Sequence, residues 1–192
     1  MSGYLFTDTE TTGLEGDVRI TQLASIRTDL NLKVRGVFYS HVYLPPDVEI
    51  SDYVKNLTGL THEHLKNEPN EENVLSAWLD FSITYEDEDD LIFAGFNAAY
   101  DLRIICARLN AIGLYERLCV KTPGYCVMKH SKEMLPNMPE RVNEDGTISR
   151  YKLELVGPYL GIHGKRQHNA LSDITQTFNI ARRYRRMKSE VH

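Results

Sequence analysis

Short runs of alternating apolar and polar residues open the sequence, and a period of two predicts β-strands. Short links join the first three runs, so we expect an antiparallel meander that ends at Pro45 and Pro46. A compact apolar run further on predicts a buried strand. The predicted strands cover residues 4–8, 18–28, 33–44 and 91–95.

Apolar residues at helical spacing predict helices in the rest of the chain. Ser51 and Thr61 are expected N-caps of two short helices separated by Gly59. Residues 136–150 are rich in Pro, Asn, Gly and charge, which predicts a loop long enough to be functional or mobile. The other helices are expected at residues 70–84, 98–112, 122–135, 152–160 and 169–187.

The order of these elements defines the fold class. Three strands followed by alternating helices and strands predict an α/β protein with a mixed β-sheet flanked by α-helices. The 192 residues show no linker or repeat, so we expect a single domain over residues 1–192. No apolar run is long enough to span a membrane and no signal-peptide pattern is present, so we expect no membrane partner.

The cysteines and the charge say little about the cellular compartment and the binding partners. Cys106, Cys119 and Cys126 form no C-x-x-C pair, and their odd number favours inert, buried thiols in a reducing cytoplasm. The net charge of −5 does not indicate a nucleic-acid binder. Residues 86–90 form an acidic block that we interpret as a solvated loop. The basic residues at 182–188 fit a phosphate contact or a solvated helix end equally well.

Two carboxylates at the end of the first strand are the first sign of chemistry. Asp8 and Glu10 lie two residues apart, and Gly13 ends the run. Side chains at i and i+2 of a strand share a face, so these carboxylates lie side by side and repel each other unless a cation lies between them. Hard oxygen ligands favour Mg²⁺ or Mn²⁺.

Two further acids each follow an asparagine near a predicted helix start. Asp101 follows Asn97, a plausible N-cap, and Asp173 follows Asn169. The helix dipole favours the ionised form of an acid at this position. His168 lies about 140° from Asp173 on a helix of 3.6 residues per turn, so if both serve one site, His168 lies before the helix on a loop that swings.

Each of these residues has an ordinary structural interpretation on its own. A single Asp near a helix start is commonly a first-turn acid, and a lone His is usually structural or solvated. The combination carries the argument: an acid pair at a strand end, an acid after a buried strand, then a histidine and an acid in that order.

At these residues the chain resembles the DEDD superfamily of 3′–5′ exonucleases, in its histidine-bearing branch. The three family motifs match residues 8–14, 95–101 and 168–173. A closer resemblance is to the nuclease domain of bacterial exonuclease I, at residues 22–29, 57–61 and 151–155. The sequence departs in having Phe96 where many relatives have His, and in ending where further domains of exonuclease I would start. The resemblance implies a ribonuclease H-like fold.

The resemblance also implies roles for the acids and the histidine. Two Mg²⁺ or Mn²⁺ ions about 3.5–4 Å apart would assist an in-line hydrolysis of the phosphodiester. Asp8 would bridge them, Glu10 and Asp173 would complete the site that activates water, and Asp101 would hold the second ion. His168 would act as the general base. The expected activity is a metal-dependent 3′–5′ exonuclease.

Substrate contacts follow from the same resemblance. The segment after the acid pair would cradle the 3′-terminal nucleotide, with Leu14 as a wedge at the last base. Phe96 and Tyr100 are candidates for stacking on a base, although burial of Phe96 in the core is at least as good an interpretation. The full set of expected contacts is Thr9, Thr11, Thr12, Leu14, Phe96, Asn97, Tyr100, Lys165 and Arg166.

Several alternatives stay open at the level of sequence. The expected partner is the 3′ end of single-stranded DNA or RNA, with DNA favoured. An exoribonuclease on short RNA and a non-catalytic nucleic-acid-binding module of the same fold are the alternatives. A monomer and a homodimer are both reasonable. Repair, proofreading, RNA maturation, phage replication and antiviral defence all suit such a nuclease.

Overall fold

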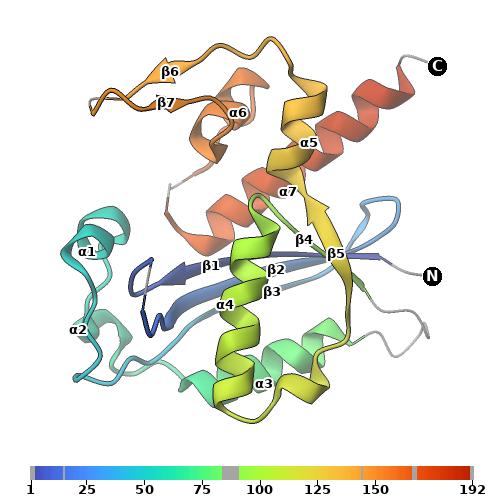
Figure 1. Ribbon diagram of the computed structural model, residues 1–192. Coiled ribbons are helices and arrows are strands. Elements are labelled where there is room, and N and C mark those ends of the chain that lie inside the picture. Colours follow the sequence, from blue (N-terminus) through green and yellow to red (C-terminus); the bar gives the residue numbers. More distant parts are fainter. Residues whose placement is uncertain (1–2, 15, 84–90, 144, 166–167, 191–192) are drawn as a thin grey trace.

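Five strands form one mixed sheet in the order β3-β2-β1-β4-β5 (Figure 1). The computed structural model describes residues 3–14, 16–83, 91–143, 145–165 and 168–190. The first three strands are antiparallel, whereas β4 and β5 run parallel to β1. The expected mixed sheet is therefore confirmed. The strands are β1 (Gly3–Thr11), β2 (Ile20–Asp29), β3 (Val34–His41), β4 (Leu91–Gly95) and β5 (Val120–Cys126).

The helices largely follow the sequence prediction, and the expected N-caps Ser51 and Thr61 each accept a backbone N–H. Asn97 stands at the N-cap position of α4 but makes no side-chain cap hydrogen bond. A short 3₁₀ turn, η1, covers Tyr115–Arg117. The helices in the described part of the chain are α1 (Asp52–Thr58), α2 (His62–Leu65), α3 (Glu71–Ser82), α4 (Ala98–Ala111), α5 (Val127–Met134), α6 (Leu153–Tyr159) and α7 (Ala170–Ser189).

The two faces of the sheet bury separate apolar clusters. Leu5 and Phe6 are neighbours on β1 and point to opposite faces, as strand geometry requires. Leu5 packs with Trp78 of α3 and with α4, whereas Phe6 packs with Tyr184 of α7. Figure 1 shows α3 and α4 on one side of the sheet and α5, α6 and α7 on the other. Because both faces are covered, polar groups gather at the strand ends.

The prediction of a helix over residues 122–135 is wrong in its first half. Residues Val120–Cys126 form the terminal strand β5, and the helix α5 begins at Val127. Pro123 is tolerated because a strand at the sheet edge needs hydrogen bonds on one side only. A Cβ on Gly124 would lie 2.3 Å from the Phe93 carbonyl oxygen, so the close approach of β5 to β4 requires glycine there.

Two further expectations are modified. The predicted loop at 136–150 contains a hairpin of β6 (Arg141–Val142) and β7 (Ile148–Ser149). The three cysteines are free, but none is fully buried as expected: Cys106 and Cys126 are half-buried and Cys119 is exposed. The acidic block at 86–90 lies outside the described residues. No helix in the described ranges is both long enough and apolar enough to cross a membrane.

Candidate active site

The acid pair lies where β1 loses its neighbour on one side. The pairing of β1 with β4 ends at Phe6, while its pairing with β2 continues to Thr11. Asp8 and Glu10 therefore lie on a strand that β2 still supports, next to the gap into which α4 begins. Figure 1 shows the end of β1 close to the start of α7, which also contacts this strand.

Asp101 of α4 fills the place of the missing ladder partner. Its Oδ1 accepts the Thr9 backbone N–H at 3.0 Å and the Thr9 hydroxyl at 2.9 Å. The side chain is only 5% exposed. These two bonds satisfy a buried backbone donor and hold Asp101 beside Asp8. Thr9, expected as a substrate contact, is thus mainly a partner of an acid in this structure.

The start of α7 brings in the histidine and the fourth acid. His168 has φ +56°, a left-handed conformation that is uncommon for a residue other than glycine. Its backbone N–H donates to Asp173 Oδ2 at 3.1 Å. Asn169 caps the helix by accepting the Ser172 backbone N–H. As expected from the spacing, His168 lies before the helix, and its bond to Asp173 folds it back over the first turn.

A glutamine that the sequence reasoning missed fixes this helix start to the sheet. Gln22 of β2 is paired with Glu10 and is 2% exposed. Its Oε1 accepts the Ala170 backbone N–H at 3.0 Å and the Asn169 side-chain amide at 3.2 Å. No sequence signal singled it out, because Thr21, Ser25 and Thr28 on the same strand are buried polar residues as well. Gln22 therefore joins the strand that pairs with the acid pair to the helix that carries Asp173.

The result is a single cluster of four carboxylates and one imidazole. Ligand atoms of Glu10, His168 and Asp173 all lie within 4.8 Å of one another. Asp8 is close enough to Asp101, Glu10 and Asp173 for each to raise its pKa. The structure thus brings together all five residues that the sequence singled out.

Among the described residues, no salt bridge compensates the charge of this cluster. Burial, and then the neighbouring acids, raise the pKa of Asp8 well above its ordinary value. Burial first, with Asp173 and Asp101 next, raises the pKa of Glu10 to about 8. Burial raises the pKa of Asp101 to about 7 against the two Thr9 hydrogen bonds, and raises that of Asp173 to about 6. In the described ranges, the acids that form salt bridges are not the four carboxylates of this cluster.

These observations fit a divalent cation. Crowded carboxylates with raised pKa values are the arrangement that a bound cation would relieve. The donors are carboxylate oxygens, which suit Mg²⁺ and Mn²⁺, while the single imidazole is the one donor of softer type. The pKa of His168 is lowered by its burial, and Glu154 of α6 acts in the opposite direction. The imidazole is therefore neutral near pH 7 and can accept a proton.

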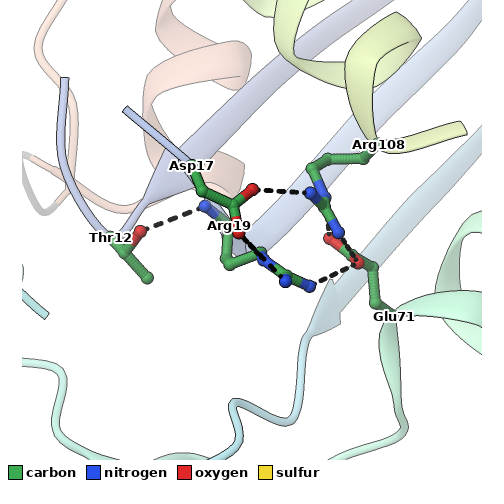
Figure 2. A network of polar contacts seen from close by, with 5 residues as sticks. All are labelled: Thr12, Asp17, Arg19, Glu71 and Arg108. Atoms are coloured by element: carbon green, nitrogen blue, oxygen red, sulfur yellow. Dashed lines mark hydrogen bonds and ion pairs between the residues drawn. The ribbon is translucent and has the colours of Figure 1, made fainter. Parts of the chain in front are cut away.

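The loop after the acid pair is held by a network of ion pairs that the sequence did not reveal (Figure 2). Arg108 of α4 is 7% exposed and donates to both carboxylate oxygens of Glu71, each at 2.8 Å. It also donates to Asp17 at 3.0 Å. The Arg19 backbone N–H donates to the Thr12 hydroxyl at 3.0 Å. Asp17 and Arg19 are therefore held to α3 and to the helix that carries Asp101, and Arg19 in turn binds Thr12.

The other expected substrate contacts fall into exposed and buried groups. Leu14 is 62% exposed beside the site, and Asn97 and Lys165 are also exposed. Phe96 is 9% exposed and belongs to the core on the α7 side, which favours its structural interpretation. Tyr100 is half-buried, with the guanidinium of Arg103 over its ring. Arg166 lies outside the described residues.

The comparisons place this fold and cluster in an exonuclease family. The family model for RNase_T, described as Exonuclease, matches residues 5–181, and the chain belongs to this family. Members of this family depend on metal ions, in agreement with the carboxylate cluster. The expected class of protein and its nuclease chemistry are thereby confirmed.

The individual relatives share only about a quarter or less of their residues with this chain. The chain is 25% identical over 178 residues to DNA polymerase III subunit epsilon of Aquifex aeolicus, covering 92% of this chain and 77% of that one. It is 27% identical over 194 residues to DNA polymerase III PolC-type of Thermotoga maritima, covering 98% of this chain but 12% of that one. Exonuclease I of E. coli in complex with a dT13 oligonucleotide superposes with a TM-score of 0.76 at 21% identity, covering all of this chain and 42% of that one. This similarity confirms the ribonuclease H-like fold. The chain spans less than half the length of exonuclease I and about an eighth of PolC.

Proposed function

We propose that this chain is a divalent-metal-dependent 3′–5′ exonuclease that hydrolyses single-stranded nucleic acid, with DNA preferred over RNA. The observation that carries the proposal is the approach of Glu10, His168 and Asp173 within 4.8 Å at the end of β1. Asp8 and Asp101 adjoin this group. The named relatives support the choice of DNA, since they are DNA polymerase components and an exonuclease bound to a DNA oligonucleotide.

The four carboxylates would hold two Mg²⁺ or Mn²⁺ ions. When bound, such ions lower the pKa of an attacking water and neutralise charge on the leaving 3′ oxygen. Thr9 keeps one oxygen of Asp101 occupied, so that the other stays available to a ligand. Gln22 holds the start of α7, and with it Asp173, in place against β2.

His168 would take the proton of the attacking water at its unprotonated ring nitrogen. Burial lowers its pKa, which leaves this nitrogen free at neutral pH. The backbone bond to Asp173 sets the position of the histidine next to the acids. The resemblance at motif level gives this histidine the same role.

The loop after the acid pair would receive the 3′-terminal nucleotide. Leu14 is 62% exposed on the loop that follows the acid pair, and an exposed leucine there suits a wedge at the last base. The hydroxyl of Thr11 donates to the Gly13 carbonyl at 2.8 Å, and Thr12 accepts from Arg19, so both threonines shape the turn that presents Leu14.

Single strands labelled at the 5′ end test the proposal. With Mg²⁺ the wild type should shorten a strand with a free 3′ hydroxyl and spare one with a blocked 3′ end, and Asp8→Ala should be inactive. Cleavage at the same rate with and without the 3′ block, or cleavage that persists in Asp8→Ala, would refute the mechanism. Matched DNA and RNA strands decide the substrate. If RNA is hydrolysed faster than DNA, then RNA and not DNA is the preferred polymer.

A further inference from the structure

The outer flank of α7 carries an arginine cluster that the metal site does not use. Arg182, Arg183 and Arg186 are exposed and line a groove of about 300 Å³ together with Gly161, Ile162 and Asn179. We call this surface the arginine groove. In the part of the chain that the structure describes, none of the three arginines forms a salt bridge. On a chain with net charge −5, this is a concentrated positive surface.

The arginine groove lies on the helix that begins beside the catalytic cluster, and it borders the segment that follows α6. Its floor includes Ile162, in the connection between α6 and α7 that leads on to His168. The Gln176 side-chain amide donates to the Ile162 carbonyl at 3.0 Å. A Cβ on Gly164 would lie 3.0 Å from Gln176 Oε1, so Ile162 and Gly164 lie directly against α7. Figure 1 shows α6 beside the N-terminal half of the same helix.

The distance along the helix says which part of a substrate reaches the groove. Arg183 and Arg186 lie about 15–20 Å along α7 from Asp173, at a rise of 1.5 Å per residue. Around the helix axis, Arg183 lies about 80° from Asp173 and Arg186 about 140°, at 3.6 residues per turn. A strand whose 3′ end lies at the acids would therefore reach these arginines with phosphates several nucleotides upstream. The reacting phosphodiester itself would not touch them.

We propose that the arginine groove binds upstream phosphates of the single strand whose 3′ end occupies the catalytic cluster. This inference rests on the proposed function. Guanidinium groups bind phosphate through paired hydrogen bonds, and they stay charged at any working pH. Because the contact lies upstream of the reacting bond, it raises the affinity for long strands and leaves the chemical step unchanged. An acidic protein segment is the competing occupant.

The double variant Arg183→Gln/Arg186→Gln tests the proposal, with Lys129→Gln/Lys132→Gln as the control. The control lysines are exposed on α5 and lie outside the groove. KM and kcat are measured for a trinucleotide and for a strand of about 15 nucleotides, and binding of the longer strand is measured separately in EDTA. The arginine variant should raise KM and Kd for the long strand by about tenfold in 0.1 M salt and lower the slope of log K against log salt by about 1.4. KM for the trinucleotide and kcat for both should not change.

Two results would refute the proposed role of the arginine groove without refuting the proposed nuclease activity. A loss of equal size on both lengths would mean that the arginines act on the structure of the site. Unchanged KM and Kd on both lengths would leave the acidic protein as the occupant. Absence of 3′ shortening by the wild type would instead refute the proposed function. In that case the binding measurement in EDTA still decides whether the groove holds a strand.

Discussion

The side-chain oxygen of Gln22 accepts the backbone N–H of Ala170 at 3.0 Å. This bond joins two segments almost 150 residues apart, and it sets the first residue of α7 against the strand that pairs with Glu10. The relative position of the acid pair and of Asp173 therefore depends on one buried amide. A side chain that touches no substrate is expected to control the geometry of the site.

Replacing the Gln22 amide should lower the activity by more than the accompanying loss of stability explains. Gln22→Met keeps the volume and removes the acceptor for two donors, which should cost about 1–3 kcal/mol of unfolding free energy. Because Asp173 loses its fixed position, kcat should fall at least tenfold and the Mg²⁺ concentration for half-maximal rate should rise. Thr28→Val on the same strand removes a buried hydroxyl far from the site and is the control. Equal kcat in the two variants would contradict the positioning role.

The hydroxyl of Thr9 is the second positioning contact. Thr9→Val removes one of the two hydrogen bonds to Asp101 and retains the backbone bond. We expect the Mg²⁺ requirement to rise by about tenfold, as is typical when a partner of a metal ligand is removed. Thr7→Val, two residues earlier on β1, removes a hydroxyl that contacts Ser25 instead. A shift of the Mg²⁺ titration in Thr7→Val but not in Thr9→Val would refute the assignment.

The crowded acids predict an unusual pH dependence of stability in EDTA. The pKa of Glu10 is raised from 4.5 to about 8, so the folded state holds this proton to a higher pH than the unfolded state. By linkage, the unfolding free energy contributed by this group falls as the pH rises from about 4.5 to about 8. Glu10→Gln should therefore be more stable than the wild type at pH 8.5 by about 1 kcal/mol or more, and the gain should shrink at pH 5.

Urea unfolding at the two pH values, with and without Mg²⁺, measures this effect. Mg²⁺ should stabilise the wild type more at pH 8.5 than at pH 5, because protons compete with the ion at the lower pH. A Glu10→Gln variant that is less stable than the wild type at pH 8.5 in EDTA would show that the acids are already compensated.

The ion-pair network of Figure 2 predicts a strong dependence on one arginine. Arg108→Met leaves the Glu71 carboxylate, 14% exposed, without its bidentate partner. Because Arg19 stays 3.6 Å from Glu71, the loss should be about 1.5–3 kcal/mol of unfolding free energy, below that of a fully unpaired buried charge. Arg108→Met/Glu71→Met should recover much of that loss, because no buried charge remains unpaired. A double variant no more stable than Arg108→Met would refute this account of the network.

The sequence singled out five residues that the structure brings together, whereas it predicted some of the elements around them wrongly. Asp8, Asp101 and Asp173 were found because each stands at a strand end or helix start, where local pattern is informative. The same local reasoning failed at residues 122–126. Pro123 and Gly124 suggest a helix start, whereas their actual constraint is contact with β4, and a single sequence does not display that contact.

The residues that hold the site in place were also missed for a physical reason. Gln22 and Arg108 act through contacts with residues 37 to 148 positions away, and no periodicity or spacing links them. Thr9 lies between the two acids of the pair, but its bond to Asp101 depends on the end of the β1–β4 ladder. Such contacts follow from tertiary structure and not from sequence pattern.

The central claim is that the five clustered residues hydrolyse a strand from its 3′ end. The most direct measurement follows the release of mononucleotides from a single-stranded DNA as Mg²⁺ is added, for the wild type and for Asp173→Asn. The wild type should release 5′-mononucleotides one at a time from the 3′ end, with none in EDTA. Asp173→Asn should bind the strand and release nothing. Mononucleotide release by Asp173→Asn at the wild-type rate, or release that proceeds in EDTA, would contradict the account.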